Sequence, residues 1–453
     1  MKTNRILFLT SVALITVGTC SLANAGEVIV EADHRVPIVQ LKIGFHAGSA
    51  SDPAGKTGVA SLLSQLMRRG TTSKSWGEVN QALDSLGASL DGSTGEATFW
   101  FNGTVMPEKL NEYLDLAAEV ILHPAFDQSQ FEKLKKQAIS SAQMALEDND
   151  SVGEDQLHQL IFGSHPYGRV TQIKDLNAIT LDDLKAFYSS ALSGSNLIIA
   201  ACGDVESTNL TVFQKKIETE LNPNSKGIVT KIPAFTNWPV KHKVVLIDKP
   251  GQTQANIYIA HPGVALDDAN RTALWVANEA FGHNWTSRLF KDIRDQHGWA
   301  YSVESYFERI KPAGFWASIM TSQNENAPKA LAEVVKLIAE FGKNGITADE
   351  FAMQSGSIVN AEGFTYDTAA KRLGNTISEK LNNLPEHFWQ NLATRVKALT
   401  LDDVNAAIKA FVQPDKEVIL VVGTAAVLKA PIAKALGIQE SDIIVRDYRD
   451  ENE

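Results

Sequence analysis

Thr180-Leu181-Asp182-Asp183 recurs further along this chain as Thr400-Leu401-Asp402-Asp403. In each copy the threonine opens a predicted helix, and the aspartates lie in its first turn, where they favour the positive end of the helix dipole. An apolar, β-rich run that ends in glycine follows each helix, at Leu197–Gly203 and at Val418–Gly423, and Gly203 and Gly423 are separated by the same offset as the two threonines. The tetrapeptide therefore belongs to a longer repeat.

Two further pairs of residues support the repeat. Phe131 and Phe351 have the same offset, and each begins the apolar face of a predicted helix. Pro107 and Pro328, whose offset is longer by a single position, each start a preceding helix, where the missing N–H of proline costs nothing. Four anchors with essentially one offset indicate a structural duplication, in units of about 210–220 residues.

The order of predicted elements is the same in both units. A strand (38–45; 255–261) is followed by a helix (58–69; 271–281) and by further strands (97–105; 314–321). Two long helices follow, which in the first unit are predicted over 107–122 and 127–146 from their apolar spacing. A last helix and strand close each unit. This order predicts an α+β fold with two homologous units, each a sheet with helices packed on it.

Residues 1–25 have the features of a secretion signal. Lys2 and Arg5 precede an apolar run at 6–17, and Ala23-Asn24-Ala25 fits a cleavage site. The run is too short to span a bilayer, so we expect export to the periplasm of a Gram-negative bacterium. Cys20 leaves a lipoprotein as an alternative, which Thr19 disfavours because a lipobox carries a small residue at that position.

The mature chain is predicted to divide into four segments. An N-terminal domain spans 26–221, a linker with several prolines and asparagines spans 222–243, a C-terminal domain spans 244–446, and an acidic tail spans 447–453. Signal cleavage leaves Cys202 as the one cysteine, so no internal disulfide can form. Cys202 lies in an apolar run and is expected to be a buried strand residue.

Composition excludes some classes of protein. The 453 residues include 42 Lys and Arg and 53 Asp and Glu, for a formal net charge of −11. With 44% apolar and 21% charged residues, the chain is globular and not intrinsically disordered. The acidic balance and the lack of a Lys/Arg cluster argue against nucleic-acid binding, because phosphate contacts need such clusters.

Several motifs together resemble the insulinase-like, or pitrilysin-type, zinc metallopeptidases, which include the mitochondrial processing peptidase. The stretch from Gly58 to Gly70-Thr71 is similar to the active-site helix of that family and the Gly-Thr after it. The second unit contributes Ser287-Arg288-Leu289-Phe290 and Gly298-Trp299-Ala300-Tyr301-Ser302. The resemblance covers nearly the whole mature chain, and it implies a clamshell-forming fold, in which two such chains close around a chamber that admits unfolded peptides.

The active-site helix departs from the family pattern, His-x-x-Glu-His. Two histidines at i and i+4 share one helix face and can ligate one Zn²⁺, and the glutamate can act as general base. The matching residues here are Ser61, Ser64 and Gln65, and Ala142 lies in the stretch that matches the third ligand, a glutamate. No His-x-x-x-His, His-Glu-x-x-His or Cys-x-x-Cys replaces them, and the ten histidines are expected to be surface or loop residues. We therefore expect no metal in this chain and no peptidase activity from it alone.

Arg294 and Tyr301 match a pair that the family uses, from its second domain, to engage the substrate. A guanidinium and a phenol O–H can stabilise the negative charge that peptide hydrolysis builds on the carbonyl oxygen. Spacing alone favours a structural interpretation, in which Arg294 complements a helix C-terminus while Tyr301 starts a strand. The matching motifs around the pair favour the functional one.

The loss of the zinc-binding residues and the presence of Arg294 and Tyr301 together favour one role. The family includes peptidases made of two chains, one with zinc and one without. The resemblance implies that this chain is the non-catalytic subunit, with Arg294 and Tyr301 acting in trans on unfolded peptide, and that Zn²⁺ is held by a partner with an intact His-x-x-Glu-His. The alternative is a non-enzymatic peptide-binding or scaffold protein of the same fold.

Overall fold

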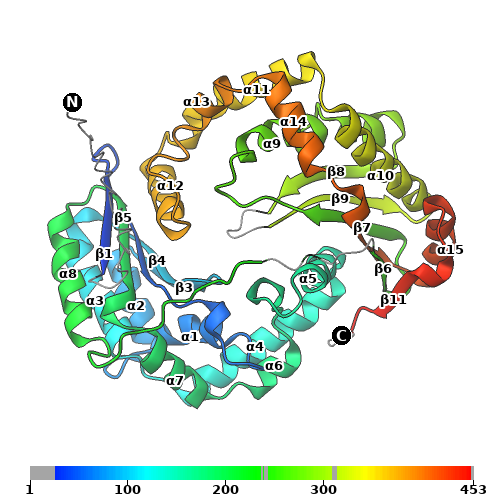
Figure 1. The fold of residues 1–453 in the computed structure, drawn as a ribbon. Helices are drawn as coiled ribbons and strands as arrows, with labels where there is room; N and C mark the ends of the chain where they lie inside the picture. Colours follow the sequence, from blue (N-terminus) through cyan, green and yellow to red (C-terminus); the bar gives the residue numbers. More distant parts are fainter. Residues whose placement is uncertain (1–25, 236–237, 239–242, 309–313, 450–453) are drawn as a thin grey trace, which may run out of the picture.

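The computed structural model describes residues 26–235, 238, 243–308 and 314–449. The predicted signal segment 1–25 lies outside the described residues, as do 236–237 and 239–242 of the predicted linker and 450–453 of the predicted tail. The described chain forms two α+β units, each a mixed sheet with helices packed on it, arranged along an open arc (Figure 1). The predicted fold class, an α+β duplication, is confirmed.

The first unit is built on a five-stranded sheet of order β1-β5-β2-β4-β3. Its strands are β1 (Glu27–Ala32), β2 (Val39–Phe45), β3 (Ser89–Thr94), β4 (Phe99–Val105) and β5 (Leu197–Gly203). β1 runs parallel to β5, and the other neighbours are antiparallel. Alternate residues of β2 and β4, such as Ile43 and Phe101, are fully buried beneath helices, so the alternation in the sequence selects the core face.

Helices of the first unit, with the exception of α5, cover that core face. The helices of this unit are η1 (Ser49–Ser51), α1 (Val59–Met67), α2 (Trp76–Leu86), η2 (Pro107–Lys109), α3 (Leu110–Leu122), α4 (Gln128–Glu147), α5 (Asn149–Phe162), η3 (Pro166–Gly168), α6 (Ile173–Ala178), α7 (Leu181–Ala191), η4 (Gly194–Asn196) and α8 (Ser207–Glu220). Cys202 lies in β5 and is buried, which confirms its expected place.

The second unit has a six-stranded sheet of order β11-β6-β10-β7-β9-β8. Its strands are β6 (Lys243–Asp248), β7 (Gln254–Pro262), β8 (Ala300–Phe307), β9 (Phe315–Gln323), β10 (Val418–Gly423) and β11 (Ile443–Asp447). Its helices are α9 (Arg271–Asn278), η5 (Glu279–His283), η6 (Phe290–Gln296), α10 (Ala327–Asn344), α11 (Ala348–Ala361), η7 (Glu362–Thr365), α12 (Ala369–Leu381), α13 (Leu392–Lys397), α14 (Leu401–Phe411), η8 (Pro414–Lys416), α15 (Ala425–Leu436) and η9 (Glu440–Asp442).

The helix predicted over 271–281 differs from the observed one. α9 ends at Asn278, and η5 winds as a wider π-helical turn. A Cβ on Gly282 would stand 2.4 Å from the Ser305 hydroxyl of β8, so this turn lies against the sheet more closely than a side chain would allow. The change from α to π geometry could not be read from apolar spacing.

The repeated tetrapeptides hold equivalent places in the two units. Thr180 and Thr400 each form a capping box, with the backbone N–H of Asp183 and Asp403 donating to the threonine Oγ1 at 3.3 and 3.2 Å. The capped helices, α7 and α14, each lead into a strand inside its sheet, β5 and β10. The duplication seen in the sequence is therefore also present in the structure.

One helix of each unit packs on the sheet of the other. Helix α5 lies on β7 and β10, where its residues Val152, Leu157 and Phe162 share an apolar cluster with the second sheet. In return, α12 lies on β1 and β5, and its smaller cluster includes Leu373 and Cys202. Arg372 adds an ion pair of 3.4 Å to Glu31 of β1. This exchange joins the two units of the arc (Figure 1).

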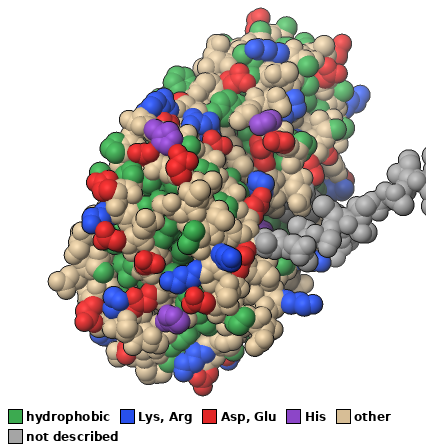
Figure 2. Space-filling view, turned by 90° about the vertical axis from the view of Figure 1, so that its left-hand side faces the viewer, with side chains coloured by type: hydrophobic (Ala, Val, Ile, Leu, Met, Phe, Trp, Pro, Cys, Tyr) green, Lys and Arg blue, Asp and Glu red, His purple; other side chains and the backbone are tan. Residues whose placement is uncertain are grey.

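The surface carries charges of both signs. On the face that shows the side of the first unit, acidic and basic side chains are interspersed and do not gather into a basic patch (Figure 2). Among the described helices, none is both long and apolar enough to cross a bilayer.

The second unit buries two titratable groups. His261 lies in β7 with no exposed surface, so the expectation that the histidines are surface or loop residues is wrong for it. Burial lowers the pKa of His261 to about 4, against the effect of a hydrogen bond between its Nδ1 and the Pro262 carbonyl. Glu417 is 1% exposed, its Oε1 accepts no hydrogen bond within the described residues, and burial raises its pKa to about 8. Stability contributed by Glu417 is therefore present below pH 4.5 and lost as the pH rises to about 8. That of His261 has the opposite sign and is lost as the pH falls from 6.5 to about 4.

We expect Glu417→Gln to remove the pH dependence of stability that Glu417 causes and to leave that of His261 in place. Relative to the parent, the free energy of unfolding of the variant should rise by about 1.4 kcal/mol per pH unit across the Glu417 window. Urea denaturation of both proteins at pH 5, 6.5 and 8 measures the difference. A difference that stays constant over this range would show that Glu417 ionises without cost.

Candidate functional site

Helix α1 is fixed at its start by a buried carboxylate. Asp52 accepts hydrogen bonds from the backbone N–H of Gly58, at 2.7 Å, and of Ala60, at 2.8 Å. Burial raises the pKa of Asp52 to about 6, against the effect of these two bonds. Gly58 has a φ of 112°, a conformation that favours glycine, and α1 then buries its apolar face on β3 and β4.

The loop after α1 is held by Glu119 of α3. Thr71 Oγ1 and Lys74 Nζ each donate to this carboxylate at 2.6 Å, and Ser73 also donates to it. Burial alone would raise the pKa of Glu119, but these bonds outweigh burial and lower it to about 2. The Gly-Thr of the motif therefore has a structural role here.

The candidate positions on α1 and α4 offer no metal ligands. Ser61 and Gln65 lie one turn apart on the exposed face, whereas Ser64 is buried and donates its hydroxyl to the Ser61 carbonyl at 2.8 Å. Ala142 of α4 packs on the first core. Zn²⁺ binds imidazole, thiolate or carboxylate groups, so these residues do not fit it. Nowhere among the described residues do three or more His, Cys, Asp or Glu gather in a way that could hold a metal ion.

Arg294 and Tyr301 come together in the second unit. Arg294 lies on η6 and Tyr301 near the start of β8, and the guanidinium carbon stands 5.0 Å from the centre of the Tyr301 ring. The helix-end and strand-start placement predicted from spacing is also present. Both residues are remote in the chain from α1, which packs within the first unit on β3, β4, α4 and α7.

Two aromatic residues that the sequence analysis did not single out complete this cluster. The Trp285 and Phe290 rings stack at 5.7 Å, and Arg294 lies 5.8 Å from the first centre and 4.5 Å from the second. We call Trp285, Phe290, Arg294 and Tyr301 the Arg294 cluster. Aromatic residues flank Arg294 on both sides in the sequence, which could have suggested an aromatic environment for it. The sequence did not show that two of these rings stack on each other.

Arg294 contacts the rings of its own cluster but makes no polar contact with any described residue. Within the described residues, the Arg294 guanidinium makes no hydrogen bond or ion pair, and the Tyr301 hydroxyl makes no hydrogen bond. Tyr301 is 84% exposed and Trp285 76%. A guanidinium held only by ring faces keeps its N–H donors free for an external acceptor.

The segment that carries the cluster is anchored to α11. Arg288 donates to both carboxylate oxygens of Glu350, at 2.7 and 2.6 Å, and to the Gly345 carbonyl at 2.8 Å. Asn284 donates to the Gln354 side chain at 3.0 Å. The Ser287–Phe290 signature therefore fixes the segment from which Arg294 projects.

Known families match both parts of the chain. Residues 27–173 match the model described as insulinase (peptidase family M16), and residues 178–355 match the peptidase M16 inactive domain. This chain belongs to the peptidase M16 family. The predicted zinc-site positions of this M16 protein, Ser61, Ser64, Gln65 and Ala142, carry no imidazole, thiolate or carboxylate group.

Individual relatives agree with this placement. The non-peptidase homolog YmxG of Helicobacter pylori is 26% identical over 395 residues, which cover 85% of this chain and 89% of that protein. A crystal structure of the peptidase M16 inactive domain from Pseudomonas fluorescens superposes with a TM-score of 0.79 at 24% identity, over 89% of this chain and 98% of that one. The periplasmic protease PqqL from Escherichia coli has the same fold, with a TM-score of 0.72 at 14% identity, over 94% of this chain and 49% of that one.

Proposed function

We propose that this M16 protein is the non-catalytic subunit of a heterodimeric zinc peptidase in the periplasm. It binds peptide substrate and supplies Arg294 and Tyr301 to the active site of a partner that carries His-x-x-Glu-His. The observation that supports this most is the Arg294 cluster, in which a guanidinium and a phenol without internal partners stand side by side at the surface.

The chemistry of the proposed role follows from these two groups. Attack on a peptide carbonyl places negative charge on its oxygen, and preorganised donors that point at this oxygen lower the barrier. Arg294 can hold the carbonyl before attack because its charge is permanent. The Tyr301 O–H is a neutral donor, and its hydrogen bond strengthens as the charge develops. The partner supplies Zn²⁺ and the activated water.

We expect the purified chain to hold far less than one Zn²⁺ per molecule and to cleave no peptide. The reason is that Ser61, Ser64, Gln65 and Ala142 provide neither imidazole nor carboxylate. Metal analysis by mass spectrometry, together with a fluorogenic peptide assay, measures both quantities. One tightly bound Zn²⁺ per chain, lost together with peptidase activity on chelation, would overturn the proposal.

A further inference from the structure

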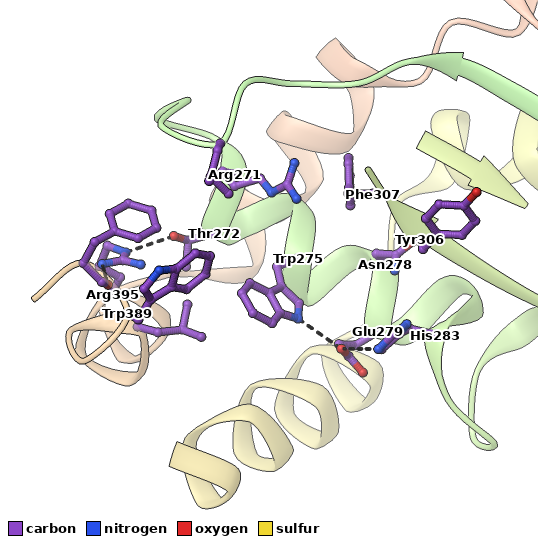
Figure 3. A pocket seen from close by; sticks show the side chains of 13 residues that line it. Arg271, Thr272, Trp275, Asn278, Glu279, His283, Tyr306, Phe307, Trp389 and Arg395 are labelled. Atoms are coloured by element: carbon purple, nitrogen blue, oxygen red, sulfur yellow. Dashed lines mark hydrogen bonds and ion pairs between the residues drawn. The ribbon is translucent and has the colours of Figure 1, made fainter. Parts of the chain in front are cut away.

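The second unit also contains a concave site outside the Arg294 cluster. It is lined by α9, η5, the end of β8, the stretch that leads into α13 and α13 itself, and it opens to solvent. We call it the Trp275 pocket (Figure 3). His283 lines it and stands just before Trp285 in the sequence, so the pocket and the Arg294 cluster are continuous along the chain.

The walls of the pocket are aromatic. Trp275 of α9 and Trp389 meet edge to face at 6.5 Å, and Phe388 meets Trp389 in the same way at 5.1 Å. Trp275 occupies the middle of the site, with Trp389 and Arg395 on one side and Glu279 on the other (Figure 3). Such walls fit a flat or bulky apolar group.

A fixed guanidinium stands at one end. Arg395 donates from Nη1 to the Phe388 carbonyl at 2.7 Å and from Nε to Thr272 Oγ1 at 3.2 Å, and it lies 4.2 Å from the Phe388 ring centre. No carboxylate among the described residues pairs with it, and partial burial lowers its pKa. A partly desolvated guanidinium with donors to spare is a site for a carboxylate.

The other charged side chains of the pocket favour the binding of an anion at its Arg395 end. Arg271 also lines the site, over the Phe307 ring at 4.7 Å. The one lining carboxylate, Glu279, accepts hydrogen bonds from Trp275 Nε1 at 3.1 Å and from Asn284 at 3.1 Å, and lies 3.8 Å from His283. The lining therefore contains two arginines, Arg271 and Arg395, and one glutamate.

We infer that the Trp275 pocket binds the carboxy terminus of a peptide whose last residue is aromatic or bulky and apolar. The terminal carboxylate pairs with Arg395, and the side chain packs against the aromatic wall that Trp275 and Trp389 form together. Peptide hydrolysis creates new carboxy termini of this kind. The inference goes beyond the proposed subunit role and needs no zinc-bearing partner, so the two can fail independently.

Four acetylated peptides that differ only at the last position test this inference: Phe acid, Phe amide, Gly acid and Gly amide. Binding to the purified chain is followed by calorimetry and by tryptophan fluorescence, which reports on Trp275 and Trp389. We expect the Phe acid to bind at least about 10-fold more tightly than the Phe amide or the Gly acid, because it alone satisfies both features of the pocket.

Arg395→Gln should abolish the preference for acid over amide and keep the preference for Phe over Gly. Arg395→Lys should restore part of the acid preference, and its thermal melt checks that the fold is intact. Lys397→Gln is the matched control, because it removes one positive charge from the exposed end of the same helix, α13. Equal binding of acid and amide by the parent, or an acid preference that survives Arg395→Gln, would overturn the inference.

Discussion

In a reconstituted pair with a zinc-bearing M16 partner, Tyr301→Phe should lower kcat by about 10²–10³ and leave the complex assembled. Removal of a single oxyanion donor typically has an effect of this size, which corresponds to about 3–4 kcal/mol. The substitution keeps the ring that faces Arg294, so it removes the hydroxyl alone. Because the lost interaction strengthens only as charge develops, KM should change much less than kcat.

The controls for this experiment lie on the same segment. Ser302→Ala removes the hydroxyl of the adjacent exposed residue of β8 and should leave kcat unchanged. Arg294→Ala should affect both kcat and KM, because a guanidinium can also hold the carbonyl before attack. If Tyr301→Phe has an unchanged kcat in a verified complex, the pair is structural and the scaffold alternative becomes the better account.

Phe162→Ala should lower the free energy of unfolding by about 3–5 kcal/mol, the range for buried Phe truncations. Phe162 ends α5, is 4% exposed, and contacts aromatic rings from both units, Tyr167 of the first at 5.6 Å and Phe315 of the second at 5.9 Å. It therefore stands where the helix of the first unit packs on the sheet of the second.

Phe364→Ala is the matched control for this prediction. Phe364 is 72% exposed, so the same truncation should change stability by less than about 0.5 kcal/mol. Urea denaturation of the parent and both variants compares the two sites. Equal effects at Phe162 and Phe364 would mean that the exchange of α5 contributes little to joining the units.

The duplication could be predicted because its signals are local. Thr180 and Thr400 cap their helices through the residues three positions on, so a repeated tetrapeptide was enough to find the start of both helices, and the structure adds the capping boxes. The exchange of α5 and α12 could not be predicted. An apolar helix face shows that the helix is buried, but not which of two similar sheets covers it.

The candidate site was also predictable in part, because some of its signals are local in the sequence. The sequence alone shows that Ser61, Ser64 and Gln65 cannot form the family's zinc site. Their spacing on one helix matches that of the family's ligands, and none of the three is a histidine or a glutamate. The pairing of Arg294 with Tyr301 came from a resemblance, and the structure adds the stacked Trp285 and Phe290. The Trp275 pocket combines α9 with residues that come much later in the chain, a juxtaposition that only the fold creates.

The central claim, that peptide cleavage needs both chains, is tested most directly by a titration. A zinc-bearing M16 partner from the same cell is held at fixed concentration, and this chain is added while cleavage of a fluorogenic peptide is followed. We expect negligible cleavage by either chain alone and a rate that rises to a plateau at one copy of this chain per partner. Full activity of the partner alone, unchanged when this chain is added, would contradict the account.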